Sequence, residues 1–307
     1  MMADEKTVLV FGATGQQGGA VARALRAEGW LVRALVRDPA GTKAKALEAA
    51  GVDLHPGDFS DHASIAAAMS GVHGVFSVQP SSGQGPVFGI TDEQELRYGK
   101  AIADLSAAHG VRHLVYTSVA AAGKGITGLG HFDMKTEIEE HVRSLGIRST
   151  IVRPVTFMEI LMLPGMGLDH GTYSFLMRPD QAMQLIAVDD IGRIVATIFS
   201  DPDRFAGRTI EIAGDAVTGK GLQDAFSRAA GRTITYNRFP DSLLAQNRFL
   251  GRLAELVDDG RCAGAVDIPA LRQEFGALQS LEEWLCGAGR PLFISSLEAS
   301  GGTVALR

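Results

Sequence analysis

One stretch near the N-terminus decides the fold: residues 7–29 read TVLVFGATGQQGGAVARALRAEG. It begins with an apolar, β-prone run and ends with a helical pattern, and three glycines spaced G-x-x-G-x-x-G lie between them. Such glycines let the backbone approach a pyrophosphate, and the helix that follows points free N–H groups at it. The stretch therefore predicts a dinucleotide-binding turn rather than a glycine turn without a ligand. The predicted contact residues are Gly12, Thr14, Gly15, Gln16, Gln17 and Gly18.

The first half of the chain alternates predicted strands with predicted helices. Strand-like runs occupy residues 7–11, 30–36, 52–55, 74–78, 113–118 and 149–153. Helical patterns occupy residues 18–28, 43–50, 62–70 and 92–109, and a glycine follows each of them. Thr91 and Gln94 form a capping box for the last one. This order predicts an α/β fold with a Rossmann-type, doubly wound parallel sheet.

The second half is patterned differently. Residues 154–185 are irregular and rich in proline and methionine, which favours an adaptable apolar surface. Residues 186–200 predict a short strand and a helix capped by Asp189 or Asp190, and residues 209–213 and 233–236 predict two more strands. We expect residues 1–153 to form the dinucleotide-binding Rossmann domain, completed by about 186–213. Residues 154–185 and 214–307 are expected to form a smaller C-terminal α+β domain that meets a substrate or a partner.

Bulk composition excludes several classes of protein. The 307 residues carry a net charge of -6, which argues against direct nucleic-acid binding because such proteins need a basic face. Two cysteines, no signal-like N-terminus and no long apolar run predict a cytoplasmic protein without membrane spans. The histidines show no metal-binding spacing, so no metal site is expected. For the oligomeric state, the sequence is compatible with both a monomer and a homodimer.

The end of the second predicted strand selects the dinucleotide. An NAD site places a carboxylate there, whereas a guanidinium holds the 2′-phosphate of NADP. Arg37 occupies this position and Lys43 follows it, so we expect NADP; Asp38, one residue further, is the feature that favours NAD. Asp58 and Phe59 follow the third strand and are expected beside the adenine, although a helix-capping role suits Asp58 equally well.

Seven motifs occur in a familiar order: VFGATGQQGGAVARAL, VRDP, GDFSD, VYTSVA, HFDMK, VRPVTFME and VDDIG. In this order they resemble the NmrA-like family, atypical members of the short-chain dehydrogenase/reductase superfamily, over roughly residues 5–240 and more weakly to about 290. The resemblance implies a Rossmann domain, a smaller C-terminal domain and an NADP-binding cleft between them. It also implies one of two activities, because some relatives reduce quinones, triphenylmethane dyes or lignan and isoflavone substrates, whereas others bind NADPH as redox sensors.

The reaction centre departs from the superfamily pattern of Tyr-x-x-x-Lys with a serine. In that pattern the tyrosine donates a proton to the substrate and the lysine holds the ribose. Here Lys135 and Ser118 are present, but His131 stands at the tyrosine position. Three interpretations stay open: Lys135 only fixes the ribose of a bound cofactor; hydride passes to an undemanding acceptor with help from His131 or Lys135; or His131 merely packs or caps its helix.

Three further elements border the predicted site. Gln79 and Pro80 end the fourth strand on the nicotinamide side, and residues 79–86 form either a flap or a plain solvent loop. After the sixth strand, Pro154 and Phe157 are expected near the carboxamide, although core packing is the more ordinary role for Phe157. The sequence thus predicts an NADP(H)-binding protein with two candidate functions. One is an NADPH-dependent reductase of a small conjugated acceptor, quinone- or dye-like; the other is a non-catalytic sensor of the NADPH/NADP ratio that regulates a protein partner.

Overall fold

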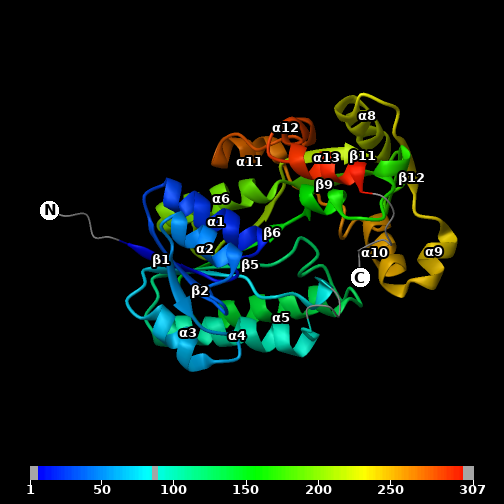
Figure 1. Ribbon diagram of the computed structural model, residues 1–307. Coiled ribbons are helices and arrows are strands. Elements are labelled where there is room, and N and C mark those ends of the chain that lie inside the picture. The colour runs from blue at the N-terminus through cyan, green and yellow to red at the C-terminus, as the bar shows by residue number, and fades with distance from the viewer. Residues whose placement is uncertain (1–5, 85–88, 300–307) are drawn as a thin grey trace.

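The computed structural model describes residues 6–84 and 89–299, and its centre is a parallel sheet of seven strands (Figure 1). The strand order is β10-β6-β5-β4-β1-β2-β3. The strands are β1 (Thr7–Val10), β2 (Leu31–Val36), β3 (Asp53–Pro56), β4 (Gly74–Ser77), β5 (His113–Thr117), β6 (Ser149–Pro154) and β10 (Thr209–Ile212). The order reverses at β1, which pairs with β2 on one side and β4 on the other. The predicted Rossmann-type doubly wound sheet is confirmed.

Helices cover both faces of this sheet (Figure 1). One face carries α1 (Gln16–Ala27), α2 (Thr42–Ala49) and α6 (Val188–Ser200), and the other carries α3 (His62–Met69), α4 (Asp92–Ala108) and α5 (Gly130–Ser144). Glycines bring neighbouring helices close together. A Cβ on Gly192 of α6 would lie 2.5 Å from the carbonyl oxygen of Ala20 in α1, and one on Gly99 of α4 would lie 2.5 Å from Ile138 Cδ1 in α5.

Residues next to the helix cap the starts of α3 and α4, whereas the start of α6 differs from its prediction. Asp61 accepts hydrogen bonds from the first turn of α3, and the Thr91–Gln94 capping box of α4 is formed. The predicted cap of α6 was wrong, because its N-cap is Ala187 and both aspartates lie inside its first turn. Glu159 supplies the acceptor instead, at 3.1 Å from the backbone nitrogen of Val188.

The remaining chain forms a second apolar core beside the first. Its strands are β7 (Thr156–Phe157), β8 (Thr172–Phe175), β9 (Ala182–Ile186), β11 (Asp215–Thr218) and β12 (Thr235–Arg238), in two small sheets ordered β11-β9-β7 and β12-β8. Its helices are α8 (Gly219–Ala230), α9 (Asp241–Gln246), α10 (Arg248–Asp258), α12 (Leu281–Cys286) and α13 (Arg290–Glu298). Two further helices, α7 (Pro202–Phe205) and α11 (Ile268–Phe275), pack against the main core instead. Single 3-10 turns span Ser82–Gln84, Met158–Met162 and Leu168–His170. All five methionines of the 154–185 segment are buried in this second core, and the division into two domains stays a prediction.

Within the described ranges, none of the helices has the length and apolar character needed to cross a membrane. In the same part of the chain, no three His, Cys, Asp or Glu side chains gather where they could hold a metal ion.

Candidate functional site

The glycine turn after β1 is built so that only glycine fits at two of its positions. Gly12 has φ +62°, a left-handed conformation that residues with a Cβ rarely adopt. A Cβ on Gly18 would lie 2.3 Å from the carbonyl oxygen of Gly12, well inside van der Waals contact. The turn is closed by a hydrogen bond of 2.8 Å from Gly15 N to Gly12 O. The turn therefore leaves no room for a side chain at Gly18 and disfavours one at Gly12.

Helix α1 begins at this turn with its N-terminus free of a side-chain cap. Its N-cap residue is Gly15, and Thr14 and Gln16 are exposed beside it. Gln17 lies deeper and accepts a 2.8 Å hydrogen bond from the hydroxyl of Thr117 at the end of β5. A pocket of about 240 Å³ borders Gly15 and Gln16 and extends to Trp284. An uncapped helix N-terminus beside a glycine turn suits a pyrophosphate, so these residues fit the expected dinucleotide.

The residues predicted to select the 2′-phosphate lie at the ends of β2 and β3. Arg37 is exposed directly after β2, and Lys43 is exposed in the first turn of α2. Asp38 is engaged locally, since its Oδ1 accepts from the backbone nitrogen of Ala40 at 2.9 Å. The hydroxyl and backbone amide of Ser60 hold the pKa of Asp58 below its ordinary value, and the Arg37 guanidinium adds to this effect. The Arg37 guanidinium is therefore within electrostatic range of the Asp58 carboxylate.

Phe59 is half-buried rather than displayed on the surface. Its ring lies 5.7 Å from that of Phe11 and 5.6 Å from that of Tyr98, measured between centroids. Asp61 caps α3, so Asp58 does not. The Asp58 carboxylate accepts hydrogen bonds from the backbone nitrogen and the hydroxyl of Ser60. The predicted adenine contacts of Asp58 and Phe59 stay predictions.

Gln79, just after β4, has a buried side-chain amide whose oxygen and nitrogen are in different situations. Gln79 is 5 % exposed, and its Nε2 donates to Ser77 Oγ at 2.7 Å. Its Oε1 is buried and has no hydrogen-bond partner among the residues that the structure describes. A buried acceptor of this kind calls for a donor from outside the chain or from water, and the carboxamide and ribose of a nicotinamide nucleotide carry such donors. Pro80 is half-buried next to it, and residues 85 and 86 of the predicted flap lie outside the described residues.

Lys135 and His131 share the first turns of α5 but have different neighbours. The Lys135 ammonium donates to Oε1 of Glu95, a fully buried carboxylate on α4. The His131 ring is 7 % exposed and lies 5.5 Å from the ring of Phe249 in α10. A Cβ on Gly83 would lie 2.6 Å from His131 Cδ2, so the imidazole packs against the chain after β4.

Ser118 lies directly after β5, buried beside another carboxylate. Its hydroxyl faces Glu139 of α5, and Arg153 Nη2 donates to Glu139 Oε2 at 2.6 Å. Burial alone would raise the pKa of Glu139, but the hydrogen bonds from Arg153 hold it below its ordinary value. The serine thus lies beside a charged pair on the α5 side of the sheet.

Pro154 and Phe157 are placed mainly by backbone pairing. The carbonyl of Pro154 accepts from Ala120 N at 3.0 Å, and Phe157 pairs with Ile186 in the small sheet. The Phe157 side chain packs against the main core, which is the ordinary role considered for it. Contact with a carboxamide stays a prediction for both residues.

The segment that follows Ser118 is held by the C-terminal part of the chain. Arg252 Nε of α10 donates to the carbonyl of Thr127 at 2.5 Å, and Arg261 Nη1 donates to that of Ile126 at 3.0 Å. Asp133 of α5 accepts from Thr127 N at 2.8 Å on the other side. Sequence reasoning missed these arginines, because nothing local relates them to residues far earlier in the chain.

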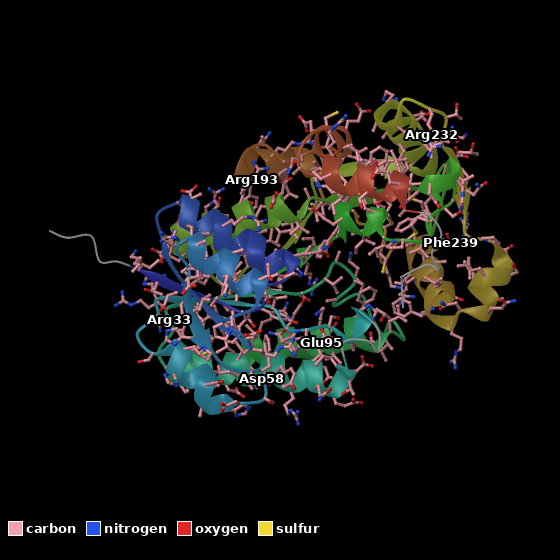
Figure 2. The ribbon with its side chains drawn as sticks, viewed as in Figure 1. Arg33, Asp58, Glu95, Arg193, Arg232 and Phe239 are labelled. Atoms are coloured by element: carbon pink, nitrogen blue, oxygen red, sulfur yellow. The ribbon has the colours of Figure 1, made fainter. Side chains whose placement is uncertain are left out.

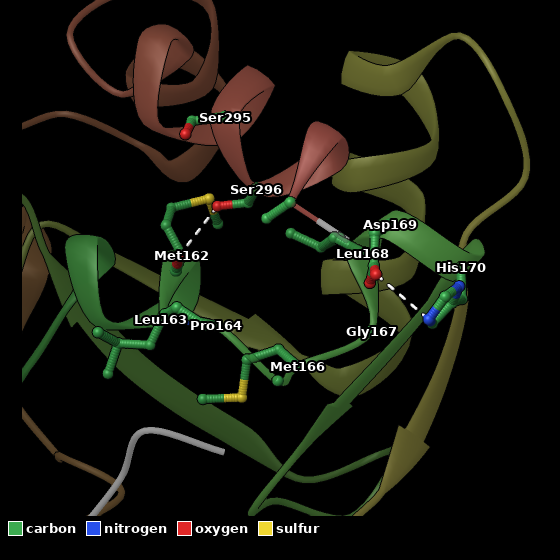
Figure 3. A pocket seen from close by; sticks show the side chains of 12 residues that line it. Met162, Leu163, Pro164, Met166, Gly167, Leu168, Asp169, His170, Ser295 and Ser296 are labelled. Atoms are coloured by element: carbon green, nitrogen blue, oxygen red, sulfur yellow. Dashed lines mark hydrogen bonds and ion pairs between the residues drawn. The ribbon is translucent and has the colours of Figure 1, made fainter. Parts of the chain in front are cut away.

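A second pocket lies away from the glycine turn (Figure 3). It has a volume of about 250 Å³ and lies between the methionine-rich segment and α13. Met162, Met166 and Leu168 form its apolar side, and Asp169 and His170 pair at its rim at 3.2 Å. Met162 lines this pocket, whereas Met158 of the same segment does not, and both belong to the second core.

A parallel sheet whose strand order reverses at a glycine-rich turn, with a helix N-terminus behind that turn, defines the class of Rossmann-type α/β proteins. Within this class the chain belongs to the NmrA-like family, whose model matches residues 4–284. It is 30% identical over 258 residues to the NmrA-like family domain-containing oxidoreductase ptmS of Penicillium ochrochloron, covering 77% of this chain and 76% of the relative.

Solved structures share the fold across nearly the whole chain. NmrA, a negative transcriptional regulator solved in complex with NAD, superposes with a TM-score of 0.77 at 23% identity, covering 98% of this chain and 99% of that one. The NADPH-dependent quinone oxidoreductase QOR2 of Escherichia coli, solved with NADPH, gives a TM-score of 0.73 at 24% identity, covering 92% of this chain and 99% of that one. One of these two proteins is a regulator and the other an enzyme, so the shared fold alone leaves the activity open.

Proposed function

We propose that this protein binds NADP(H) and uses it to reduce a small conjugated acceptor of the quinone or dye type. The observation that carries the proposal is the pairing of an uncapped glycine turn with an exposed guanidinium at the end of the next strand. In this assignment Gly12 to Gly18 and the start of α1 bind the pyrophosphate, and Arg37 and Lys43 bind the 2′-phosphate. Support comes from the quinone oxidoreductase of the same fold, which was solved with NADPH.

The bound dinucleotide supplies a hydride, and the residues around it bind and orient the reactants. Lys135 holds the nicotinamide ribose, and the unused end of the Gln79 amide receives a donor from the same half of the cofactor. A quinone or cationic dye accepts hydride with little acid assistance, so the absence of a tyrosine four residues before Lys135 is compatible with turnover. His131 then serves as a packing residue, in keeping with its neighbours Gly83 and Phe249.

The second candidate function is a non-catalytic sensor of the NADPH/NADP ratio that regulates a protein partner. His131 favours this function, because its buried ring occupies the position at which ordinary reductases of the superfamily carry the proton-donating tyrosine. Support also comes from NmrA, a negative transcriptional regulator of the same fold that was solved with NAD.

One set of measurements separates the two functions. Calorimetric titration with NADPH, NADP and NADH establishes binding, and the loss of NADPH absorbance follows turnover with a panel of quinones, triphenylmethane dyes and aldehydes. The reductase proposal expects oxidation above background with a quinone or a dye. Tight NADPH binding with no oxidation of any acceptor would overturn it, and equal affinity for NADPH and NADP would exclude the sensor.

A further inference from the structure

A buried carboxylate joins the chain after β4 to the lysine of α5. Glu95 of α4 has no exposed surface, and Figure 2 places it in the helical layer formed by α4 and α5. Its Oε1 accepts from the Lys135 ammonium. Its Oε2 accepts from the backbone nitrogen of Ser82 at 2.9 Å and from the hydroxyl of Ser81 at 3.1 Å.

The same stretch of chain is fixed by two further contacts. Ser82 Oγ also donates to Asp92 Oδ1 at 2.5 Å, at the start of α4. Gly83 lies so close to His131 that a Cβ would meet the imidazole at 2.6 Å. Residues 81–83, which directly follow the buried Gln79 and Pro80, therefore rest on the first turns of both helices.

The ion pair leaves part of the lysine available. An ammonium has three donors, and Glu95 uses one of them. The Lys135 side chain is 12 % exposed, whereas that of Glu95 is fully buried, so a ligand that reaches this ion pair contacts the lysine and not the carboxylate. A buried carboxylate with several donors holds its partner in one place, because moving the lysine away would leave a buried charge uncompensated.

We propose that Glu95 is a positioning residue for the nicotinamide half of the cofactor. It holds the Lys135 ammonium and the backbone of Ser82 in a fixed relation, so that the lysine and the end of β4 meet the nicotinamide riboside together. The inference rests on the proposed NADP(H) binding and on the assignment of Lys135 to the ribose. The adenosine half is assigned to Arg37 and Lys43, which follow β2, two strands away from β4 in the sheet. We expect its binding to be independent of Glu95.

The test compares two ligands that share the adenosine half. NADPH contains the nicotinamide riboside, whereas adenosine 2′,5′-bisphosphate lacks it and keeps the 2′-phosphate. We expect Glu95→Gln in the full chain to lower the affinity for NADPH about tenfold or more. A tenfold change corresponds to about 1.4 kcal/mol of binding free energy. The affinity for adenosine 2′,5′-bisphosphate should change less than about twofold. Glu93→Gln is the matched control, because it removes the same charge from an exposed position of the same helix.

A double-mutant cycle gives a second, independent readout. If Glu95 acts in part through Lys135, the loss of NADPH affinity caused by Glu95→Gln is smaller in the Lys135→Met background than in the wild type. The double variant removes both charges together, so it avoids the unpaired buried lysine if Glu95→Gln alone does not fold. Equal weakening of both ligands, unchanged NADPH affinity in Glu95→Gln, or additive losses in the cycle would each overturn the inference. A wild-type protein that binds neither ligand would instead refute the proposed function.

Discussion

Replacing Gly18 with alanine tests whether the turn after β1 is a tight backbone cradle. The added Cβ would lie 2.3 Å from Gly12 O, 2.4 Å from Gly12 C and 2.6 Å from Phe11 O. These are backbone atoms, so no side-chain rotation relieves the overlap and the turn must open. Overpacking costs about 1–3 kcal/mol, and the better helix propensity of alanine returns about 1 kcal/mol. Taking the upper end of the overpacking range, we expect a net loss of about 2 kcal/mol in the free energy of unfolding.

The effect on binding should be larger than the effect on stability, because the displaced backbone is the part assigned to the pyrophosphate. We expect NADPH affinity to fall at least about tenfold, measured by calorimetry. Gly221→Ala in α8 is the matched control, since its Cβ would meet nothing closer than Thr218 Oγ1 at 3.4 Å. That variant should be as stable as the wild type or up to about 1 kcal/mol more stable, with unchanged affinity. Wild-type stability and affinity in Gly18→Ala would refute the reasoning about the turn.

Three other predictions concern single side chains. Arg37→Ala should weaken NADPH far more than NADH, as measured by titration, and an unchanged preference would show that the 2′-phosphate assignment is wrong. Burial, with Arg148 and His73 nearby, lowers the pKa of His113 from 6.5 to about 4. Between these values the unfolded chain binds one proton more than the folded chain, so the free energy of unfolding should fall as the pH drops, by at most about 3 kcal/mol. His113→Leu should remove this component from denaturant unfolding curves recorded across the window; identical pH dependence in both proteins would contradict the burial argument. Burial raises the pKa of the Cys262 thiol to about 12, whereas Cys286 is exposed, so a thiol reagent should label Cys286 rapidly and Cys262 slowly in the native protein; Cys286→Ser should abolish the fast phase, and its persistence would contradict the prediction.

The sheet was predictable because its signals are local. The apolar runs of the central strands, the glycines after the early helices and the Thr91–Gln94 capping box each lie within a few residues of the element they specify. The turn at Gly12 to Gly18 could likewise be assigned from a strand and a helix that adjoin it in sequence. The structure places these features as expected, although the binding roles of individual residues remain predictions.

The contacts that sequence reasoning missed are tertiary. Glu95 and Lys135 are 40 residues apart, and only the folding of α4 against α5 brings them together. A signal was present, because Glu95 lies on the same helical face as the buried residues Tyr98 and Ile102. The cap of α6 was mispredicted for a similar reason, since its acceptor comes from Glu159, 29 residues earlier in the chain.

The hydrogen bonds from Arg252 and Arg261 to the carbonyls of residues 126 and 127 limit where the chain can be truncated without loss of contacts. A fragment ending at residue 246 would keep all seven strands of the central sheet and the glycine turn, yet it would lose both donors. Thr127 is almost completely buried, so its carbonyl would have to find another partner or open to water. We therefore do not expect residues 1–246 to behave as an independent unit when they are separated from the rest of the chain. Swapping C-terminal halves between relatives will succeed only where the incoming half brings equivalent arginines to this segment.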